Sequence, residues 1–372
     1  MTETTLKIAM FGHKHVLSRE GGVEIVVKEL ATRMAARGHF VTCFDRSTHH
    51  VSGSLLNDRT EYKGINIQRV WTIDKKGLAA MTSSLSAASK AAFGKYDVVH
   101  IHAEGPAAMC WIPKIRGKKV IVTIHGLDWA RAKWGGFASK YIKWGEKQAV
   151  KYADEIIVLS RGVQEYFKTT YNRDTVFIPN GVNKPQIREA DLIRKKWGLE
   201  KDSYVLFLGR IVPEKGLSYL VNAWKSVSTE KKLVIAGGAS DTEDFMNELK
   251  QQAGKNVIFT GFQQGRILEE LYSNAYIYTL PSDLEGMPLS LLEAMSYGNC
   301  CLVSDIPECT EVVGDKAVCF SHGQVDELRV VMQSLLDDES KVARYKAEAS
   351  DYICSKYNWD HVVDETLRLY RR

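Results

Sequence analysis

Residues 276–305, YIYTLPSDLEGMPLSLLEAMSYGNCCLVSD, place a strand, a loop, a helix and a second strand in direct succession. The runs YIYTL and CLV are nearly continuous apolar stretches rather than alternating ones, which is typical of strands buried on both faces. Between these runs, Pro288 suits the first turn of a helix that continues to about Tyr297. The segment therefore predicts a β–α–β unit of a parallel sheet.

Apolar runs of the same kind recur along the whole chain and alternate with stretches of helical periodicity. In one such stretch, Val23, Val26, Leu30 and Met34 follow the spacing of a helix, and Gly38 suits its end. The predicted strands are 7–11, 40–45, 65–70, 97–102, 120–125, 155–160, 175–179, 204–209, 232–237, 256–261, 276–281, 301–305 and 317–320. The pattern predicts an α/β fold with two Rossmann-like, doubly wound parallel-sheet domains that face each other across a cleft.

The length of the chain, 372 residues, also favours two domains over a single core. Turn residues give way to a charged helix start in residues 179–198, PNGVNKPQIREADLIRKKWG, which indicates the boundary. We expect an N-terminal domain over 1–183 and a C-terminal domain over 184–352. A last helix within 353–372 is expected to cross back to the first domain.

Composition indicates a globular protein, with 45% hydrophobic and 26% charged residues. The sequence contains no apolar stretch of membrane-spanning length, and MTETTLKIAMFG has no secretory pattern, so we expect a cytoplasmic protein. The seven cysteines form no C-x-x-C motif and are expected to be buried, reduced thiols.

Charge is distributed unevenly along the chain. Residues 1–184 hold 28 Lys and Arg against 16 Asp and Glu, whereas residues 185–372 hold 22 against 29. The first half therefore carries a net +12 and the second half a net −7, in agreement with the total of +5. An excess of this size suggests that the first half binds an anionic partner.

The basic excess is concentrated in residues 126–151, where six Lys and Arg oppose two acids around Trp129, Trp134 and Trp144. Cations interspersed with Trp are typical of a helix at a membrane interface, so the segment suggests peripheral contact with an anionic membrane at its inner face. The alternative is a helix packed on its own domain with solvated lysines. We expect no nucleic-acid partner, because no nucleic-acid-binding motif accompanies the charge.

The loop and helix start at 281–290 favour a phosphorylated, hydroxyl-rich ligand. Backbone N–H groups at the start of a helix bind phosphate, and carboxylates accept hydrogen bonds from sugar hydroxyls. Glu285 precedes the helix start and Glu293 follows it, which suits a nucleotide sugar. Alternatively, Glu285 is an ordinary helix N-terminal charge and Glu293 an ordinary helix-face residue.

A second loop, in LGRIVPEKG, adds two cations. Arg210 directly follows a predicted strand, and Lys215 comes five residues later, before a helix. Together they could clamp a diphosphate without a metal ion. Because the sequence has no D-x-D motif and its ten histidines show no metal-site spacing, we expect neither a metal nor a cofactor.

LGRIVPEKG together with PSDLEGMPLSLLEAMSYG resembles the family 4 glycosyltransferases, which are retaining enzymes with the GT-B fold. The resemblance extends from GGVE near the start to YNWDHVVDETLRLY at the end. The segments GGVE, HGLDW and EGMPLSLLEAM are most similar to bacterial enzymes that build cell-surface polysaccharides.

The resemblance implies that the N-terminal domain, 1–183, binds the acceptor and that the C-terminal domain, 184–352, binds the nucleotide sugar. It also implies roles for individual residues. Glu293 would hold the ribose, Arg210 and Lys215 the diphosphate, and Glu285 a hydroxyl of the donor sugar, while His125 would lie near the reacting carbon. The residues expected to be catalytic are Glu285, His125, Arg210 and Lys215. Those expected to bind the donor are Gly21, Gly22, Arg210, Lys215, Phe262, Gln263, Glu285, Gly286, Met287, Pro288, Leu289, Ser290 and Glu293. Asp128 and Trp129 are expected at the acceptor.

The predicted function is that of a hexosyltransferase-type enzyme of EC class 2.4. It would move a sugar from a nucleotide diphosphate donor, with UDP favoured by its frequency in the family, to a saccharide or lipid-linked acceptor, as in polysaccharide or glycolipid biosynthesis. Alternatives are a sugar-nucleotide epimerase of the same architecture and a non-catalytic nucleotide-sugar-binding protein. A dinucleotide oxidoreductase is disfavoured, because the first strand is followed by FGHKHVLSREGG rather than G-x-G-x-x-G.

Overall fold

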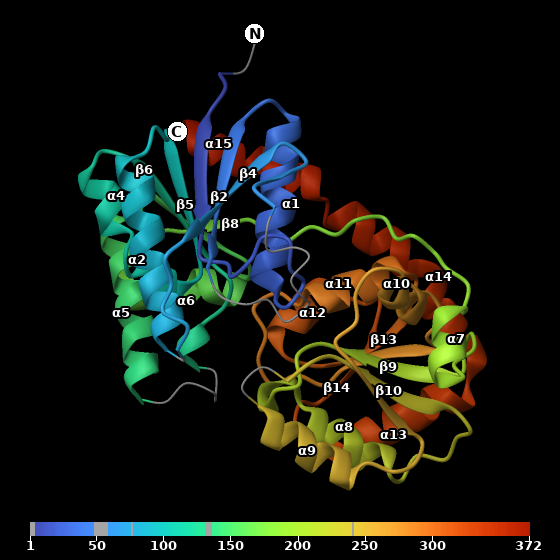
Figure 1. The fold of residues 1–372 in the computed structure, drawn as a ribbon. Coiled ribbons are helices and arrows are strands. Elements are labelled where there is room, and N and C mark those ends of the chain that lie inside the picture. The colour runs from blue at the N-terminus through green and yellow to red at the C-terminus, as the bar shows by residue number, and fades with distance from the viewer. Residues whose placement is uncertain (1–3, 48–58, 76, 131–135, 240–241) are drawn as a thin grey trace. The chain divides into compact units, whose positions relative to one another are not determined.

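The structure is a computed structural model that describes residues 4–47, 59–75, 77–130, 136–239 and 242–372. It divides into two compact units. Unit 1 comprises Met1–Asn180 and Trp359–Arg372, and unit 2 comprises Gly181–Asn358. Each unit is built around its own parallel sheet covered by helices (Figure 1).

The sheet of unit 1 has the strand order β3-β4-β2-β1-β5-β6-β7-β8, and every neighbouring pair is parallel except β3 and β4. Its strands are β1 (Lys7–Phe11), β2 (Phe40–Arg46), β3 (Glu61–Tyr62), β4 (Ile65–Val70), β5 (Val98–His102), β6 (Lys119–Ile124), β7 (Glu155–Val158) and β8 (Val176–Phe177). Its helices are α1 (Gly22–Ala36), α2 (Leu78–Phe93), α3 (Glu104–Ala107), α4 (Trp111–Ile115), the 3₁₀ turn η2 (Asp128–Ala130), α5 (Gly136–Tyr152), α6 (Arg161–Tyr171) and α15 (Trp359–Arg371).

The sheet of unit 2 has the order β11-β10-β9-β12-β13-β14 and is parallel throughout. Its strands are β9 (Tyr204–Leu208), β10 (Lys232–Ala236), β11 (Val257–Gly261), β12 (Ile277–Leu280), β13 (Cys300–Ser304) and β14 (Val318–Phe320). Its helices are α7 (Leu192–Trp197), the 3₁₀ turn η3 (Pro213–Lys215), α8 (Leu217–Trp224), α9 (Glu243–Gln252), α10 (Arg266–Ser273), α11 (Leu289–Ser296), α12 (Pro307–Val313), α13 (Val325–Asp337) and α14 (Glu339–Lys356).

The two parallel-sheet α/β domains predicted from the apolar runs are confirmed. The short antiparallel strand β3 was not predicted, because two residues, Glu61 and Tyr62, give no periodic signal. The helix predicted after Pro288 begins at Leu289, so Pro288 caps that helix instead of lying in its first turn.

The boundary between unit 1 and unit 2 lies between Asn180 and Gly181, slightly before the boundary expected after residue 183. Residues 353–358 belong to unit 2, because α14 continues to Lys356, and the C-terminal part of unit 1 begins at Trp359. Helix α15 packs on α1, where Arg37 pairs with Asp364. The hydroxyl of Tyr370, in α15, lies 2.6 Å from Nδ1 of buried His100.

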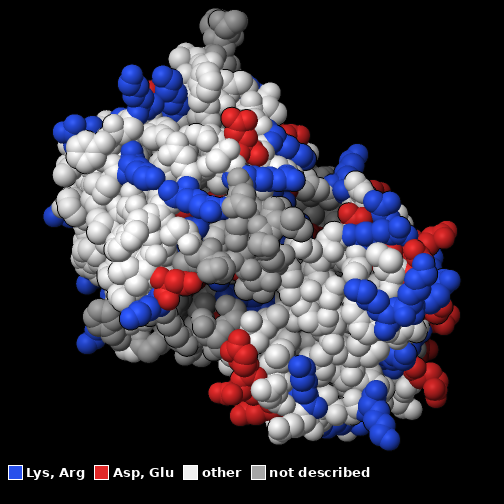
Figure 2. All heavy atoms as spheres, in the orientation of Figure 1, with Lys and Arg blue, Asp and Glu red and all other residues white. Residues whose placement is uncertain are grey.

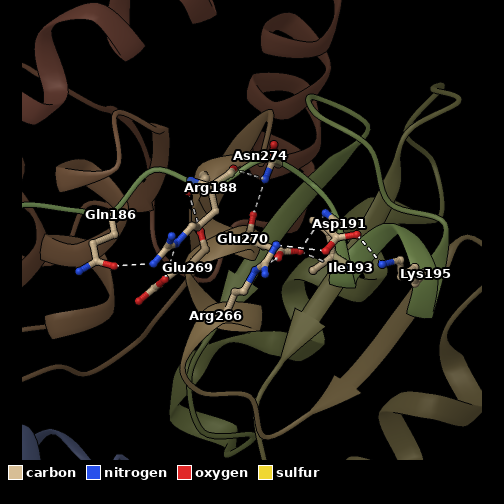
Figure 3. A network of polar contacts seen from close by, with 10 residues as sticks. Gln186, Arg188, Asp191, Ile193, Lys195, Arg266, Glu269, Glu270 and Asn274 are labelled. Carbon is tan, nitrogen blue, oxygen red and sulfur yellow. Dashed lines mark hydrogen bonds and ion pairs between the residues drawn. The ribbon is translucent and has the colours of Figure 1, made fainter.

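Residues 186–195 are fastened to α10 by a buried glutamate (Figure 3). The Glu270 side chain is fully buried and accepts hydrogen bonds from the backbone N–H groups of Asp191 and Ile193, both at 3.1 Å. Arg266 donates to the other carboxylate oxygen of Glu270 at 2.9 Å. These bonds satisfy a buried charge and secure the segment that enters unit 2.

In each sheet, the strand order reverses direction at one point. In unit 1 the chain passes from β1 outward to β2 and later resumes on the other side of β1 at β5. In unit 2 the same reversal separates β9 from β12. Ligands of open α/β sheets bind at the carboxyl ends of the strands beside this switch point, so the loops after β1, β5, β9 and β12 are the candidates for a site.

Candidate active site

The switch point of unit 2 brings together the two loops that carry the predicted cations and carboxylates. The loop after β9 contains Lys215, and the loop after β12 contains Glu285. They touch at Gly216, where an added Cβ would lie 1.8 Å from the carbonyl oxygen of Pro281. The backbone N–H of Asp283 donates to the carbonyl of Glu214 at 2.9 Å. Gly216 also has a φ of 66°, so glycine is required there for both space and conformation.

Lys215 and Glu285 form an ion pair at this junction. The Lys215 Nζ lies 2.5 Å from Oε1 of Glu285, and the hydroxyl of Ser282 donates to the same oxygen at 2.6 Å. Glu285 is only 8% exposed. A cation and a carboxylate are therefore held side by side at the carboxyl edge of the sheet.

Glu293 lies in α11, the helix that follows the loop of Glu285, and its carboxylate is oriented by a tyrosine. The hydroxyl of Tyr272, in α10, donates to Oε2 of Glu293 at 3.2 Å and lies 3.3 Å from the carbonyl of Ser290. The Tyr272 ring stacks on Tyr297, with centroids 5.2 Å apart. This contact fixes the carboxylate that was predicted to hold ribose.

The helix start of α11 offers backbone donors for an anion. The N–H groups of Leu291 and Leu292 already bond to the carbonyl of Pro288. The N–H groups of Leu289 and Ser290 lie in the first turn of α11. N–H groups in the first turn of a helix have no partner within the helix and can bind an anion. Pro288 lacks an N–H, so its predicted share in donor binding is limited to shaping the turn. Gly286 and Met287 lie between Glu285 and this turn.

The other predicted donor-site residues follow neighbouring strands of the same sheet. Arg210 comes just after β9, and Phe262 and Gln263 come just after β11. The loops after β9 and β10 approach so closely that a Cβ on Gly237 would lie 1.8 Å from the carbonyl oxygen of Gly209. Phe262 and Gln263 therefore share the carboxyl edge with Arg210, although β10 lies between their strands.

In unit 1, Gly21 and Gly22 lie at the start of α1, the helix that follows β1. A Cβ on Gly21 would lie 2.7 Å from Oε2 of buried Glu24, whose Oε1 accepts from the backbone N–H of Lys14 at 2.9 Å. Glycine at this position therefore leaves room for the glutamate that fastens the loop after β1. The same loop is held to β2 by a 2.9 Å contact between His13 and Asp45.

His125 follows β6 and lies against other histidines. Its Nε2 is 3.2 Å from Nδ1 of His102, which stacks on His100 with ring centroids 4.1 Å apart. Burial lowers the pKa of His100 to about 3 and that of His102 well below its usual value. His100 and His102 are therefore neutral at physiological pH, and they place His125 at the carboxyl edge of the sheet without adding charge.

Asp128 and Trp129, expected at the acceptor, lie in η2 and are bonded into unit 1. The backbone N–H of Asp128 donates to Oε2 of Glu104 at 2.8 Å. The indole N–H of Trp129 donates to Oε2 of Glu146 at 3.2 Å, and Lys143 lies 4.1 Å from the Trp129 ring centroid. Trp144 is 42% exposed, whereas Trp134 lies outside the described residues.

Sequence reasoning missed Tyr272, Glu104 and Glu146. Tyr272 lies in an amphipathic helix where its ring is an ordinary apolar position, and Glu146 lies in a lysine-rich helix where it is typical of a surface acid. Glu104 follows a strand end, a position with no further signal of its own. Among the described residues, no group of three or more His, Cys, Asp or Glu side chains could hold a metal ion.

No helix in the described part of the chain is long and apolar enough to cross a bilayer.

Two parallel-sheet domains, each with a polar switch point, are the architecture of a GT-B glycosyltransferase, and comparisons with known proteins agree. The family described as "Glycosyltransferase Family 4" matches residues 20–184, and "Glycosyl transferases group 1" matches residues 189–352. The chain belongs to the family 4 glycosyltransferases. It is thus a transferase of EC class 2.4, and the predicted family and enzyme class are confirmed.

Two glycosyltransferases are similar to this chain in sequence, one along nearly its whole length and one along just over half of it. An uncharacterized glycosyltransferase of Methanocaldococcus jannaschii is 26% identical over 98% of both chains. The UDP-Gal:alpha-D-GlcNAc-diphosphoundecaprenol alpha-1,3-galactosyltransferase of Escherichia coli is 30% identical over 57% of this chain and 58% of its own.

Two solved structures show the same fold. Sucrose-phosphate synthase from Thermosynechococcus elongatus has a TM-score of 0.83 at 20% identity, with 98% of each chain covered. Anabaena HepE in complex with UDP-glucose has a TM-score of 0.81 at 17% identity, with 98% of this chain and 99% of that chain covered.

Proposed function

We propose that this glycosyltransferase transfers a sugar from a UDP-sugar to a saccharide or lipid-linked acceptor with retention of the anomeric configuration. The observation that carries the proposal is the Lys215–Glu285 pair at the switch point of unit 2, with Glu293 and the helix start beside it. UDP is supported by HepE, whose solved structure contains UDP-glucose. A lipid-linked acceptor is supported by the galactosyltransferase named above, whose acceptor is a diphosphoundecaprenol.

Donor binding would replace the internal ion pair with contacts to substrate. The donor diphosphate would take the positive charge of Lys215, joined by Arg210 and the N–H groups at the start of α11. Glu285, released from Lys215, would accept a hydrogen bond from a sugar hydroxyl, and Glu293, held by Tyr272, would accept from the ribose.

The Arg210 and Lys215 cations would act mainly in the transition state. As the bond between the anomeric carbon and the phosphate oxygen breaks, positive charge develops on the sugar and negative charge on the leaving diphosphate. The acceptor oxygen forms its new bond on the same face of the sugar, and its proton passes to the departing phosphate oxygen. This step needs no enzymic nucleophile, and the cations and helix donors would hold the diphosphate without a metal ion.

Other predicted residues would complete the site. Gly21 and Gly22 would let the loop after β1 approach the diphosphate, and His125 would contact the donor sugar near its reacting carbon. Phe262 and Gln263 would border the base, and Asp128 and Trp129 the acceptor. The predicted division of the chain, with acceptor recognition in the N-terminal domain and donor recognition in the C-terminal domain, belongs to the same proposal.

We further propose that unit 1 contacts an anionic membrane from the cytoplasmic side, where lipid-linked acceptors would be available for polysaccharide or glycolipid synthesis. Helix α5 carries Lys140, Lys143, Lys147 and Lys151, and Trp144 is exposed among them. Figure 2 shows basic side chains spread over the unit 1 part of the face drawn, with acidic ones among them, and side chains of both signs over unit 2. Cations with exposed Trp are typical of interfacial segments.

Sedimentation with vesicles tests the membrane contact. Binding to vesicles with anionic phospholipid, but not to neutral ones, is expected, and Trp144→Ala should weaken it several-fold. Equal sedimentation with both vesicle types would contradict the contact.

Product analysis tests the proposed reaction. The protein is incubated with UDP-sugars and EDTA, with and without a synthetic GlcNAc-diphospholipid acceptor, and products are examined by mass spectrometry and NMR. Transfer with an α linkage from an α donor is expected. A changed UDP-sugar without acceptor would support the epimerase, an inverted linkage would contradict retention, and dependence on added metal would contradict the metal-free site.

A further inference from the structure

Two fully buried glutamates lie beneath the loop that carries Asp128 and Trp129. Glu104 begins α3 and Glu146 lies in α5, and both are 0% exposed. The two helices approach closely because residue 145 is glycine, where a Cβ would lie 2.0 Å from the carbonyl oxygen of Glu104. A buried carboxylate is costly unless it is paired or hydrogen-bonded, so the partners of this pair define its state.

Glu146 is the acceptor in its hydrogen bonds with Trp129, Tyr166 and Tyr171. Its Oε2 accepts from the Trp129 indole N–H, and its Oε1 accepts from the hydroxyls of Tyr166, at 3.0 Å, and Tyr171. An acceptor for three donors is best supplied by an ionised carboxylate, since a protonated carboxyl or an amide would place a hydrogen against one of them.

Glu104 has the opposite surroundings. Its Oε2 accepts from the backbone N–H of Asp128, but its buried Oε1 meets no donor among the described residues. Glu146 belongs to α5, which packs closely on α3 at Gly145. A proton on Glu104 would satisfy this oxygen by donating to Glu146. Burial, then the charge of Asp128, and then the neighbouring Glu146 carboxyl raise the pKa of Glu104 to about 10.

The backbone just before Glu104 has an unfavourable conformation. Ala103, the residue before it, has a φ of 75°, which is rare for a residue with a Cβ. Its N–H donates to the carbonyl of Thr123 in β6 at 2.8 Å. The chain therefore accepts an unfavourable conformation to turn Glu104 from the end of β5 toward η2 and α5.

We propose that Glu104 and Glu146 form an acid–carboxylate pair sharing one proton, and that this pair positions the loop of Asp128 and Trp129. Glu104 holds the loop backbone, and Glu146 holds the neighbouring indole. Both are positioning residues that touch no substrate. The role of the loop at the acceptor rests on the proposed function, whereas the proton and the loop geometry can be measured independently of it.

Gln variants of the two residues have opposite expected effects. In Glu104→Gln, the amide reproduces the protonated acid, because its oxygen accepts from Asp128 and its NH₂ donates to Glu146. In Glu146→Gln, the NH₂ faces donors from Trp129, Tyr166 or Tyr171, and one bond is lost. Glu165→Gln, an exposed position in α6, is the matched control.

The first measurement is difference infrared spectroscopy of the full chain at pH 8. A protonated carboxylic acid band is expected in the wild type and in Glu165→Gln and should be absent from Glu104→Gln. Absence of this band from the wild type, or its persistence in Glu104→Gln, would overturn the shared proton.

The second measurement is ¹⁹F NMR of protein labelled with 5-fluorotryptophan, in which Trp129→Phe assigns the resonance. Glu104→Gln should leave the Trp129 resonance in place, whereas Glu146→Gln should shift or broaden it. Thermal unfolding establishes that the variants are folded, and UDP affinity, a property assigned to unit 2, should stay unchanged in both. Equal behaviour of the two Gln variants would contradict the positioning role.

Transfer adds a functional measurement that separates this proposal from the proposed function. Glu146→Gln should lower the transfer rate about tenfold, as expected when one well-placed hydrogen bond is lost, and Glu104→Gln should stay within about twofold of wild type. If the wild type transfers no sugar, the proposed function fails while the infrared and NMR results still decide the pair. If transfer is intact and both variants match wild type, only the pair is contradicted.

Discussion

The two units reverse their strand order in the same way but place different groups at the reversal. In unit 2, the loops after β9 and β12 hold Lys215 and Glu285 as opposite charges. In unit 1, the strands on either side of the reversal meet at Gly12, where a Cβ would lie 2.0 Å from the carbonyl oxygen of His102. His100 and His102 are buried and neutral there, since burial lowers the pKa of both.

Under the proposed function, this difference lets one architecture support two tasks. A cation and a carboxylate that pair with each other can exchange this contact for contacts with a charged, hydroxyl-rich ligand. This property favours donor binding in unit 2. Neutral histidines and a carboxyl pair bonded to neutral donors hold the loops of unit 1 in place, which suits the acceptor positioning proposed for that unit. The predictions below test this contrast.

The largest effect is expected from Lys215→Ala. The substitution removes the cation proposed to stabilise the leaving diphosphate and leaves Glu285 buried without its counter-charge. Transfer, measured as kcat/KM for the UDP-sugar, should fall by about 10² to 10³. Lys195→Ala is the control, because the Lys195 side chain is 70% exposed and pairs with Asp191 at the surface. Similar rates in both variants would remove Lys215 from the site.

Glu293→Ala and Glu285→Gln should separate binding from transfer. Glu293→Ala removes the carboxylate proposed to accept a hydrogen bond from the ribose. UDP binding should therefore weaken about tenfold, as expected when a charged hydrogen bond is lost. Glu285→Gln should leave UDP affinity largely unchanged and slow transfer about 10²-fold, because the proposed partner of Glu285 is a hydroxyl of the donor sugar. Calorimetry with UDP and rate measurements check both variants. Unchanged UDP affinity in Glu293→Ala would end this division of roles.

Acid stability should differ between the units, because buried His100 lies in unit 1. Its pKa is lowered from 6.5 to about 3, so the unfolded chain binds the proton first as pH falls. The stabilisation is complete above about pH 6.5 and is lost as pH falls toward 3, by roughly 3 kcal/mol between pH 7 and pH 4. In urea unfolding, the free energy of unfolding of His100→Gln should fall correspondingly less between pH 7 and pH 4. His322→Gln, an exposed histidine of unit 2, should not alter the pH dependence.

The smallest effect is expected from Tyr272→Phe. Removing the hydroxyl frees the Glu293 carboxylate while keeping the ring stacked on Tyr297. UDP affinity should fall about threefold to tenfold with little change in the rate at saturating donor, which calorimetry and kinetics can measure. Tyr276→Phe is the control, because its hydroxyl contacts Leu335 instead of α11. An equal loss in both variants would indicate a general effect on unit 2.

Much of the fold could be predicted because its signals are local. Parallel strands buried on both faces are continuous apolar runs, and β9 and β12 are both of this kind. The predicted charges also followed strand ends, so the fold itself brings Lys215 and Glu285 to one edge of the sheet. Their direct ion pair could not be predicted, because it depends on the close approach of Gly216 to Pro281.

The supporting residues depend on contacts between distant segments. Tyr272 reaches Glu293 only because α10 packs beside α11, and Glu104 reaches Glu146 only because glycine at 145 admits α3. In the sequence, Glu146 is one acid in a basic helix, a pattern typical of a solvated face. A fully buried carboxylate in such a helix is recognised only once its donors are known.

The most direct test of the account is calorimetric titration of the wild type and Lys215→Ala with UDP, dTDP, GDP, ADP and NAD in the presence of EDTA. We expect selective binding of UDP by the wild type and at least tenfold weaker binding by the variant. Binding of NAD in place of UDP, or equal UDP affinity in the two proteins, would contradict the claim that this charged switch point holds the donor diphosphate.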